Sequence, residues 1–211
     1  MKLRLLPLLL LPLLASCGRG GELEDGGVYV TRSACPIVGV PAATGDITLF
    51  NPPSSRDAAA IDVTAAMTNV FANCSDAAGD RILSNVAFTV VGVRSRPGPA
   101  RQVVLPYFDA VVQGGTQVVS KRVGYVALNF AEGSLRAETR GQAVAQVSRS
   151  VATLPDDVRR ILTRPRRAGE AEAAVDPLAD PGVRAAVARA TFEHLVGFQL
   201  TQDQLRYNAT R

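Results

Sequence analysis

Runs of alternating apolar and polar residues, bounded by glycine and proline, restrict the fold of this 211-residue chain more than any other feature. They lie at 61–74, 85–93, 102–113, 117–130 and 139–154. Successive side chains of a strand point to opposite faces, so the pattern is typical of strands that bury one face. The runs predict a mainly β protein in which two sheets pack as an antiparallel sandwich.

The alternation also assigns faces within two runs. In the first run, one face carries Ile61, Val63, Ala65, Met67 and Phe71, and the other carries Thr64, Thr68 and Val70. In the last run, Ala143, Ala145, Val147 and Val151 share a face. We expect the mainly apolar faces to belong to the core.

A Gly-Gly pair at 114–115 separates two β-branched runs and predicts a hairpin, because glycine reaches positive φ without strain. Facing positions across this turn put Asp109 opposite Ser120 and one step from Arg122. A surface ion pair there would contribute little to stability.

The segment "PYFDAVV" contains the candidate partner-binding residues. Pro106 cannot donate to a ladder, which predicts a sheet edge or a bulge. Tyr107 and Phe108 point to opposite faces, so we expect one in the core and the other exposed. An exposed aromatic on an edge strand can dock a partner. The alternative is that both faces are covered.

Helical signals are confined to an insertion at about 155–190. The stretch 154–162 fits a short helix, and Asp180 and Pro181 fit the N-cap and first residue of another. The residues between them lack a core pattern, which predicts a loop or a disordered segment.

A last strand is expected near 191–200, followed by a helical turn in which Thr201 and Gln204 form a capping box. The whole of 35–211 is therefore predicted to be one immunoglobulin-like (Ig-like) β-sandwich domain, with a short helical insertion before its last strand.

Residues 1–16 have the basic start, the short apolar run and the small-residue pair of a signal peptide. The apolar run is too short to cross a bilayer, which takes about 20 helical residues. The sequence "LASC" that ends at Cys17 resembles the lipobox of bacterial lipoproteins, which implies that Cys17 is diacylated and anchors the chain in the membrane. Residues 17–34 would then be the lipidated N-terminus and a flexible tether. The alternative is ordinary secretory cleavage.

The lipoprotein resemblance also implies a compartment. Gly18 follows the cysteine where an aspartate tends to retain such proteins at the inner membrane. We therefore expect the bacterial cell envelope, at the outer membrane and on its periplasmic face.

With Cys17 assigned to the lipid anchor, two cysteines remain in the predicted domain, Cys35 and Cys74. An exported compartment is oxidising, so an even pair predicts a disulfide. A redox or metal role is the alternative, but the sequence has no CxxC motif and no histidine close to either cysteine.

The tail "LVGFQLTQDQLRYN", the segment "DITLF" and the Cys35 to Cys74 spacing resemble a group of uncharacterised bacterial lipoproteins, each with one small β-rich exported domain. The resemblance implies a fold and a compartment, and no activity.

The charge argues against a nucleic-acid partner. Loss of two basic residues with the signal peptide lowers the net charge from +4 to +2. The one dense basic stretch comprises Arg159, Arg160, Arg164, Arg166 and Arg167 and has no aromatic residue nearby, whereas nucleic-acid binders combine clustered basic residues with stacking aromatics.

No catalytic motif is present in the sequence, neither a nucleophile elbow, nor a zinc-binding His-Glu-x-x-His helix, nor a glycine-rich phosphate loop. The single histidine, His194, alternates with Phe192 and Val196, so we expect it to be packed or hydrogen-bonded. The sequence therefore predicts no catalytic residue, no metal ligand and no cofactor.

Three functions remain open. The first is a non-catalytic, lipid-anchored structural or interaction module with an envelope protein as its partner. The second is a periplasmic binder of small molecules or glycans, which requires a concave, aromatic-lined pocket. The third is a hydrolase, which requires His194 to meet a buried carboxylate and a hydroxyl.

Overall fold

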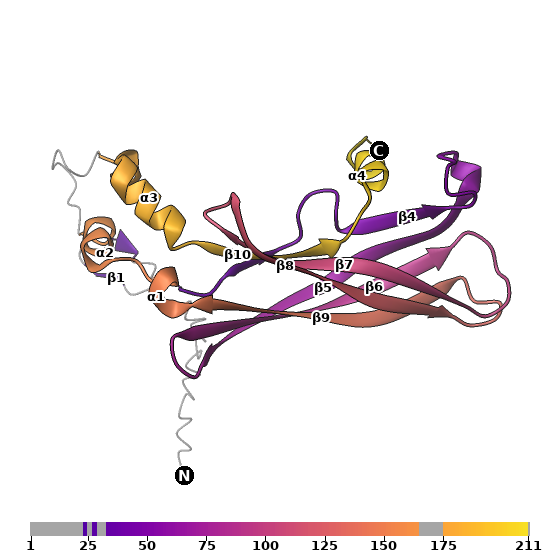
Figure 1. The fold of residues 1–211 in the computed structure, drawn as a ribbon, viewed down its shortest axis with the longest axis horizontal. Helices are drawn as coiled ribbons and strands as arrows, with labels where there is room; N and C mark the ends of the chain where they lie inside the picture. Colours follow the sequence, from indigo (N-terminus) through magenta and orange to yellow (C-terminus); the bar gives the residue numbers. More distant parts are fainter. Residues whose placement is uncertain (1–22, 25–26, 29–32, 165–174, 211) are drawn as a thin grey trace, which may run out of the picture.

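The computed structural model describes residues 23–24, 27–28, 33–164 and 175–210. Within these residues, two four-stranded sheets pack as an elongated sandwich (Figure 1). One sheet has the order β3-β10-β7-β8 and the other the order β4-β5-β6-β9. The predicted mainly β sandwich is confirmed.

The eight strands of the sandwich are β3 (Ile37–Gly39), β4 (Asp46–Phe50), β5 (Ile61–Ala77), β6 (Arg81–Arg94), β7 (Arg101–Gln113), β8 (Gln117–Phe130), β9 (Arg136–Ser148) and β10 (Phe192–Phe198). Four of the five predicted runs and the predicted last strand form strands, and the run at 139–154 does so as far as Ser148. Neighbours are antiparallel except for β3, which runs parallel to β10.

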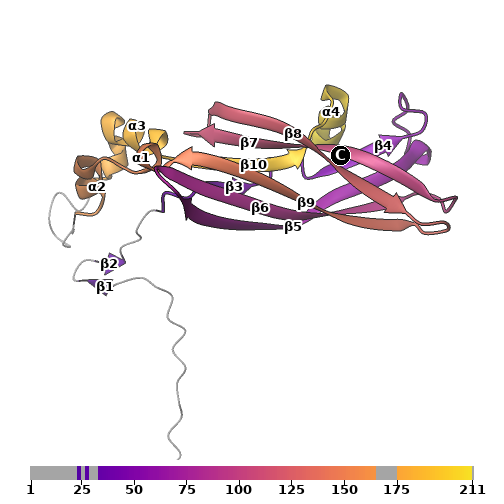
Figure 2. The ribbon, with the colours of Figure 1, turned by 60° about the horizontal axis from the view of Figure 1, so that its bottom comes forward.

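In the described part of the chain, four α-helices lie outside the sheets: α1 (Arg149–Ala152), α2 (Asp156–Leu162), α3 (Pro181–Arg189) and α4 (Gln202–Thr210). Figure 2 shows α1, α2 and α3 together at one end of the sandwich. The predicted caps are confirmed, because Asp180 Oδ1 accepts from the amides of Gly182 and Val183, and Thr201 and Gln204 bond reciprocally. Residues 165–174 of the predicted loop lie outside the described residues.

A bulge in β5 overturns the predicted face of Phe71. The pairing with β6 shifts between Thr68 and Phe71, and Asn69 between them has a positive φ of 49°. One extra residue reverses the alternation beyond it. Phe71 is therefore 78% exposed, whereas Val70 packs against the core.

The predicted face of Val151 is wrong for a different reason. Strand β9 ends at Ser148, and Val151 lies in α1 with 48% of its surface exposed. Ala143, Ala145 and Val147 of the same run are buried in β9 as expected.

The predicted register of the 114–115 hairpin is also displaced. Val112 pairs with Val118 but Val111 pairs with Ser120, so β8 has one extra residue. The turn is also one residue longer than predicted, because Gln113 pairs with Gln117, so the two shifts together place Asp109 opposite Arg122 and not Ser120.

The prediction that Pro106 marks a sheet edge or a bulge is wrong, because β7 lies between β10 and β8 and its register shift falls beyond Asp109. The carbonyl of Pro106 accepts from the amide of Gln199, just beyond the end of β10 at Phe198. The nitrogen and oxygen of a strand residue point to the same side, so the missing N–H faces the place where β10 ends. A central strand therefore accommodates this proline.

Parts of the predicted tether form a small ladder, in which β1 (Leu23–Glu24) pairs with β2 (Gly27–Val28). Cys17 and the predicted signal peptide lie outside the described residues. The predicted disulfide is present and joins Cys35, at the start of the domain, to Cys74 near the end of β5.

Replacement of both Cys35 and Cys74 by serine should lower the free energy of unfolding by about 4 kcal/mol, because the bond links positions 39 apart and restricts the unfolded chain. Urea denaturation followed by circular dichroism measures this change. Wild-type protein in a reducing agent should show the same loss, and a double variant as stable as the oxidised protein would contradict the assignment.

Candidate functional site

Three polar side chains from three strands meet inside the sandwich. The His194 ring in β10 lies with Nδ1 at 2.9 Å from the Ser84 hydroxyl in β6 and with Nε2 at 2.9 Å from Asp109 Oδ1 in β7. His194 is 0%, Ser84 1% and Asp109 7% exposed. Since β6 belongs to one sheet and β7 and β10 to the other, this polar bridge connects the two sheets through the core.

The polar bridge separates two apolar clusters of the core. One cluster includes Val86, Phe88, Val196 and Phe198, and the other includes Ile82, Val111 and Phe192. On the inner face of β6, Ser84 lies between Ile82 of one cluster and Val86 of the other. On the inner face of β10, His194 lies in the same way between Phe192 and Val196. The alternation that predicted a packed His194 therefore also places it at this boundary.

The charge of Asp109 defines the hydrogen bonds of the bridge. Burial raises the pKa of Asp109, but the hydrogen bonds from His194 and Arg122 outweigh it, so this pKa lies below its ordinary value. An ionised carboxylate only accepts hydrogen bonds. Nε2 of His194 therefore donates to Oδ1, and Arg122 Nη2 donates to Oδ2 at 2.6 Å.

Arg122 extends the bridge to the edge of the opposite sheet, where it donates to the carbonyl of Val144 in β9. Tyr107 in β7 makes a similar contact two residues earlier on β9, where its hydroxyl donates to the carbonyl of Gln142 at 2.7 Å. Two carbonyls of the edge strand β9 are thus bonded by side chains from the other sheet. The expected ion pair between Asp109 and Arg122 is present, but only its arginine lies at the surface, since the Arg122 side chain is 63% exposed and the Asp109 side chain 9%.

Serine, histidine and aspartate are the groups of a serine hydrolase triad, so the condition set for the hydrolase hypothesis is met in composition. In that triad Nε2 faces the serine, whereas here Nδ1 does. A nucleophile must also reach a substrate carbonyl, and Ser84 is 1% exposed. The described arrangement holds the sheets together and does not present Ser84 to a substrate.

The two candidate partner-binding residues occupy different environments, as their predicted opposite faces require. Tyr107 points inward, where its ring meets that of Phe88 edge-on at 5.0 Å. Burial raises the pKa of its hydroxyl, and the charge of Asp109 adds to the rise. Phe108 is half-buried in β7, and Lys121 Nζ lies 5.4 Å from its ring centroid. Only Phe108 remains a candidate for contact with a partner.

Phe108 belongs to an apolar surface on the outer face of β7 and β8, which we call the outer patch. It comprises Val104, Pro106, Phe108, Val123 and Tyr125, and the last four form two cross-strand pairs. Val104, Val123 and Tyr125 are 53%, 47% and 69% exposed. The patch reaches the edge of the sheet, because β8 is the last strand of that sheet among the described strands.

A concave aromatic cleft of about 520 Å³ lies between β4 and α4. Phe50 and Tyr207 meet there edge-on at 5.2 Å, and Arg56 lies over the Phe50 ring. The polar groups around it are engaged with one another or with the backbone, since Asp203 pairs with Arg206 and Arg56 donates to two carbonyls. The cleft has the shape expected of the small-molecule binder but few uncommitted polar groups.

The described residues contain no group of three or more metal-ligating side chains. None of the helices in that part of the chain is long and apolar enough to cross a membrane. Comparison of the chain with protein-family models, with curated proteins and with solved structures found no match.

Sequence reasoning missed Ser84 as a partner of His194, although one signal was present. Ser84 is a polar residue at a core position, between Ile82 and Val86 of an alternating run. A polar side chain at such a position needs a hydrogen-bond partner. The identity of that partner is set by the packing of the sheets, which the alternation does not reveal.

Asp109→Asn should lower the free energy of unfolding by about 3 kcal/mol at pH 5, because the amide has one acceptor oxygen where the carboxylate accepts from both His194 and Arg122, so a buried hydrogen bond to a charged group is lost. The folded pKa of Asp109 is lowered, so its contribution is complete above the ordinary aspartate pKa of about 3.9. The contribution is lost as the pH falls through the lower folded value. Urea denaturation of both proteins from pH 5 to pH 2 should show the difference shrinking.

Asp157→Asn is the matched control, because Asp157 is exposed at the start of α2. Its difference from the wild type should stay within about 0.5 kcal/mol throughout. A difference for Asp109→Asn that does not change between pH 5 and pH 2 would contradict the role given to the ionised carboxylate.

Proposed function

We propose that the protein is a lipid-anchored interaction module of the bacterial cell envelope that binds a partner protein through the outer patch. The observation that carries the proposal is the contrast between the two sides of the β7–β8 hairpin. Its inner side is committed to the polar bridge and the core, whereas its outer side exposes Val104, Val123 and Tyr125. Contiguous exposed apolar surface is typical of an interaction site.

The neighbouring edge supports the same site. From Gln117 to Val123 every residue of β8 is exposed, and Val118 and Val119 are 59% and 53% exposed. Strand β8 pairs with β7 alone among the described strands, so one side of its backbone is open to an added strand. The edge carries Lys121, besides the Arg122 already paired with Asp109, and no acidic residue, which favours an acidic partner segment.

The lipid anchor supplies the compartment in this proposal. The lipobox resemblance at Cys17 and the disulfide between Cys35 and Cys74 both suit an exported protein, since disulfides persist where the environment is oxidising. The domain follows the anchor by fewer than 20 residues, which would keep its partner close to the membrane, at the outer membrane in our proposal.

Purification of the native lipoprotein in mild detergent should yield one stoichiometric envelope partner, identified by mass spectrometry. Val123→Lys should lose it, because a charge enters the outer patch. Val93→Lys is the matched control, since Val93 is 43% exposed on the central strand β6 of the other sheet. It should keep the partner.

A third variant, Cys17→Ala, tests the anchor and should lose the partner together with membrane attachment. Retention of the partner by Val123→Lys would exclude the outer patch as the binding site. Wild-type protein that purifies alone would overturn the interaction module.

A further inference from the structure

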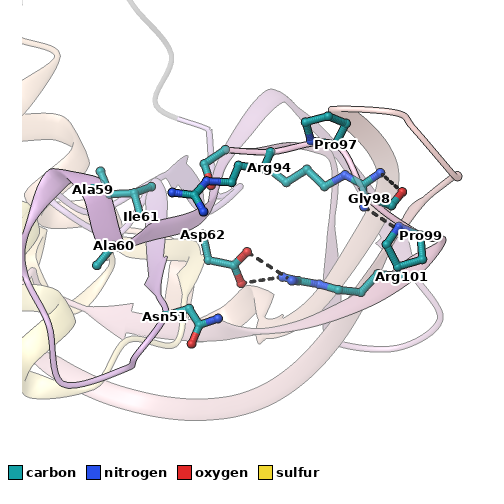
Figure 3. Close-up of a pocket in the computed structure, with 12 residues that line it drawn as sticks. Asn51, Ala59, Ala60, Ile61, Asp62, Arg94, Pro97, Gly98, Pro99 and Arg101 are labelled. Atoms are coloured by element: carbon teal, nitrogen blue, oxygen red, sulfur yellow. Dashed lines mark hydrogen bonds and ion pairs between the residues drawn. The ribbon is translucent and has the colours of Figure 1, made fainter.

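A second site, independent of the outer patch, lies at the end of the sandwich opposite the disulfide. A cleft of about 360 Å³ is lined by the start of β5, the end of β6 and the loop that leads to β7. Figure 3 shows the Asp62–Arg101 pair in this cleft, with Asn51 next to Asp62 and with Pro97, Gly98 and Pro99 in the loop. We call it the arginine cleft.

The arginine cleft has a surplus of positive charge. Arg94, Arg96 and Arg101 line it, against the single carboxylate of Asp62. Arg101 is neutralised, because its guanidinium binds both oxygens of Asp62 at 3.1 and 2.7 Å. The charges of Arg94 and Arg96 remain.

Arg94 is an arginine built into the wall of the cleft, and only 5% of its surface is exposed. Its guanidinium donates to four carbonyls, those of Gly98, Pro99, Ala131 and Ser134. No carboxylate among the described residues pairs with it. Carbonyls satisfy its hydrogen bonds but supply no counter-charge, and a buried cation without one is costly. The contacts also hold the loop at 98–99 in place.

Arg96 and two other groups are free to receive a ligand. The side chains of Arg96, Asn51 and Ser95 line the same cleft and make no hydrogen bond or ion pair within the described part of the chain. Arg94 uses four of the five N–H groups of a guanidinium, so one more donor remains on Nη1. The arginine cleft is therefore lined by unused hydrogen-bonding groups and by Arg94 and Arg96, whose positive charges no carboxylate of the described residues balances.

We infer that the arginine cleft binds a small soluble molecule bearing carboxylate or phosphate groups, with Arg96 as the exposed ligand-binding side chain and Arg94 as the buried counter-charge. Guanidinium groups match the planar oxyanion geometry of both chemistries. The volume of about 360 Å³ falls within the range of small-molecule sites.

The position of the cleft favours a soluble ligand over a headgroup of the anchoring membrane. Ile61 lines the cleft and Cys74, near the predicted tether, lies on the same strand β5. A strand rises about 3.3 Å per residue, which places the two about 40 Å apart. The cleft therefore lies at the end of β5 far from the start of the domain at Cys35.

Isothermal titration of the purified mature protein at low salt tests the inference, with citrate and inorganic phosphate as the probes. One of them should bind saturably at one site, and the tighter probe identifies the chemistry of the natural ligand. Arg96→Ala should weaken binding roughly tenfold, since it removes one charge-assisted contact.

Arg140→Ala is the matched control, because Arg140 is an exposed arginine on β9, outside the cleft, without a hydrogen bond to the described residues. It should bind as the wild type does. Equal weakening by both variants, or no saturable binding of either probe, would overturn the inference. Neither outcome affects the outer patch, which lies elsewhere on the molecule.

Discussion

The two hydrogen bonds of the His194 ring are the constraint on which the sandwich depends. A fully buried imidazole must have both nitrogens satisfied, because an unpaired polar group in the core is costly. Its partners, Ser84 and Asp109, lie on opposite sheets, so the ring fixes how the sheets face each other. Apolar packing alone tolerates sliding, whereas a fully bonded polar network specifies one arrangement.

The same constraint decides which surfaces are left for partners. Asp109 holds Arg122, and Arg122 together with Tyr107 bonds carbonyls of the edge strand β9. At an edge of the other sheet, β8 pairs only with β7 among the described strands, and its outer face carries Val123 and Tyr125 in exposed positions. Ser84, Asp109 and His194 are thereby buried in the core, while the surface offers an apolar patch and a basic cleft. The two binding sites that we propose lie on these surfaces.

The sequence pattern predicted the strands and the caps at Asp180 and Thr201, because these depend on residues close in sequence. It predicted the disulfide because only Cys35 and Cys74 remained to pair once Cys17 was assigned to the lipid anchor. It failed at Phe71, where one inserted residue reverses the faces beyond it, and at the pairing of Asp109, which a longer turn and a bulge shift by two residues. The partnership of His194 with Ser84 joins residues 110 positions apart and exists only once both sheets are packed. Arg94 was missed for the same reason, since its carbonyl partners come from two separate loops.

Nuclear magnetic resonance of the imidazole of His194 tests the central claim most directly, because this is the single histidine of the chain and its signals need no assignment. We predict that the Nε2 proton is observed at neutral pH and exchanges slowly with water, because it is buried and donated to Asp109. An Nε2 proton lost to rapid exchange would contradict the account. It would mean that the bridge opens to solvent, where Ser84 and His194 could meet a substrate.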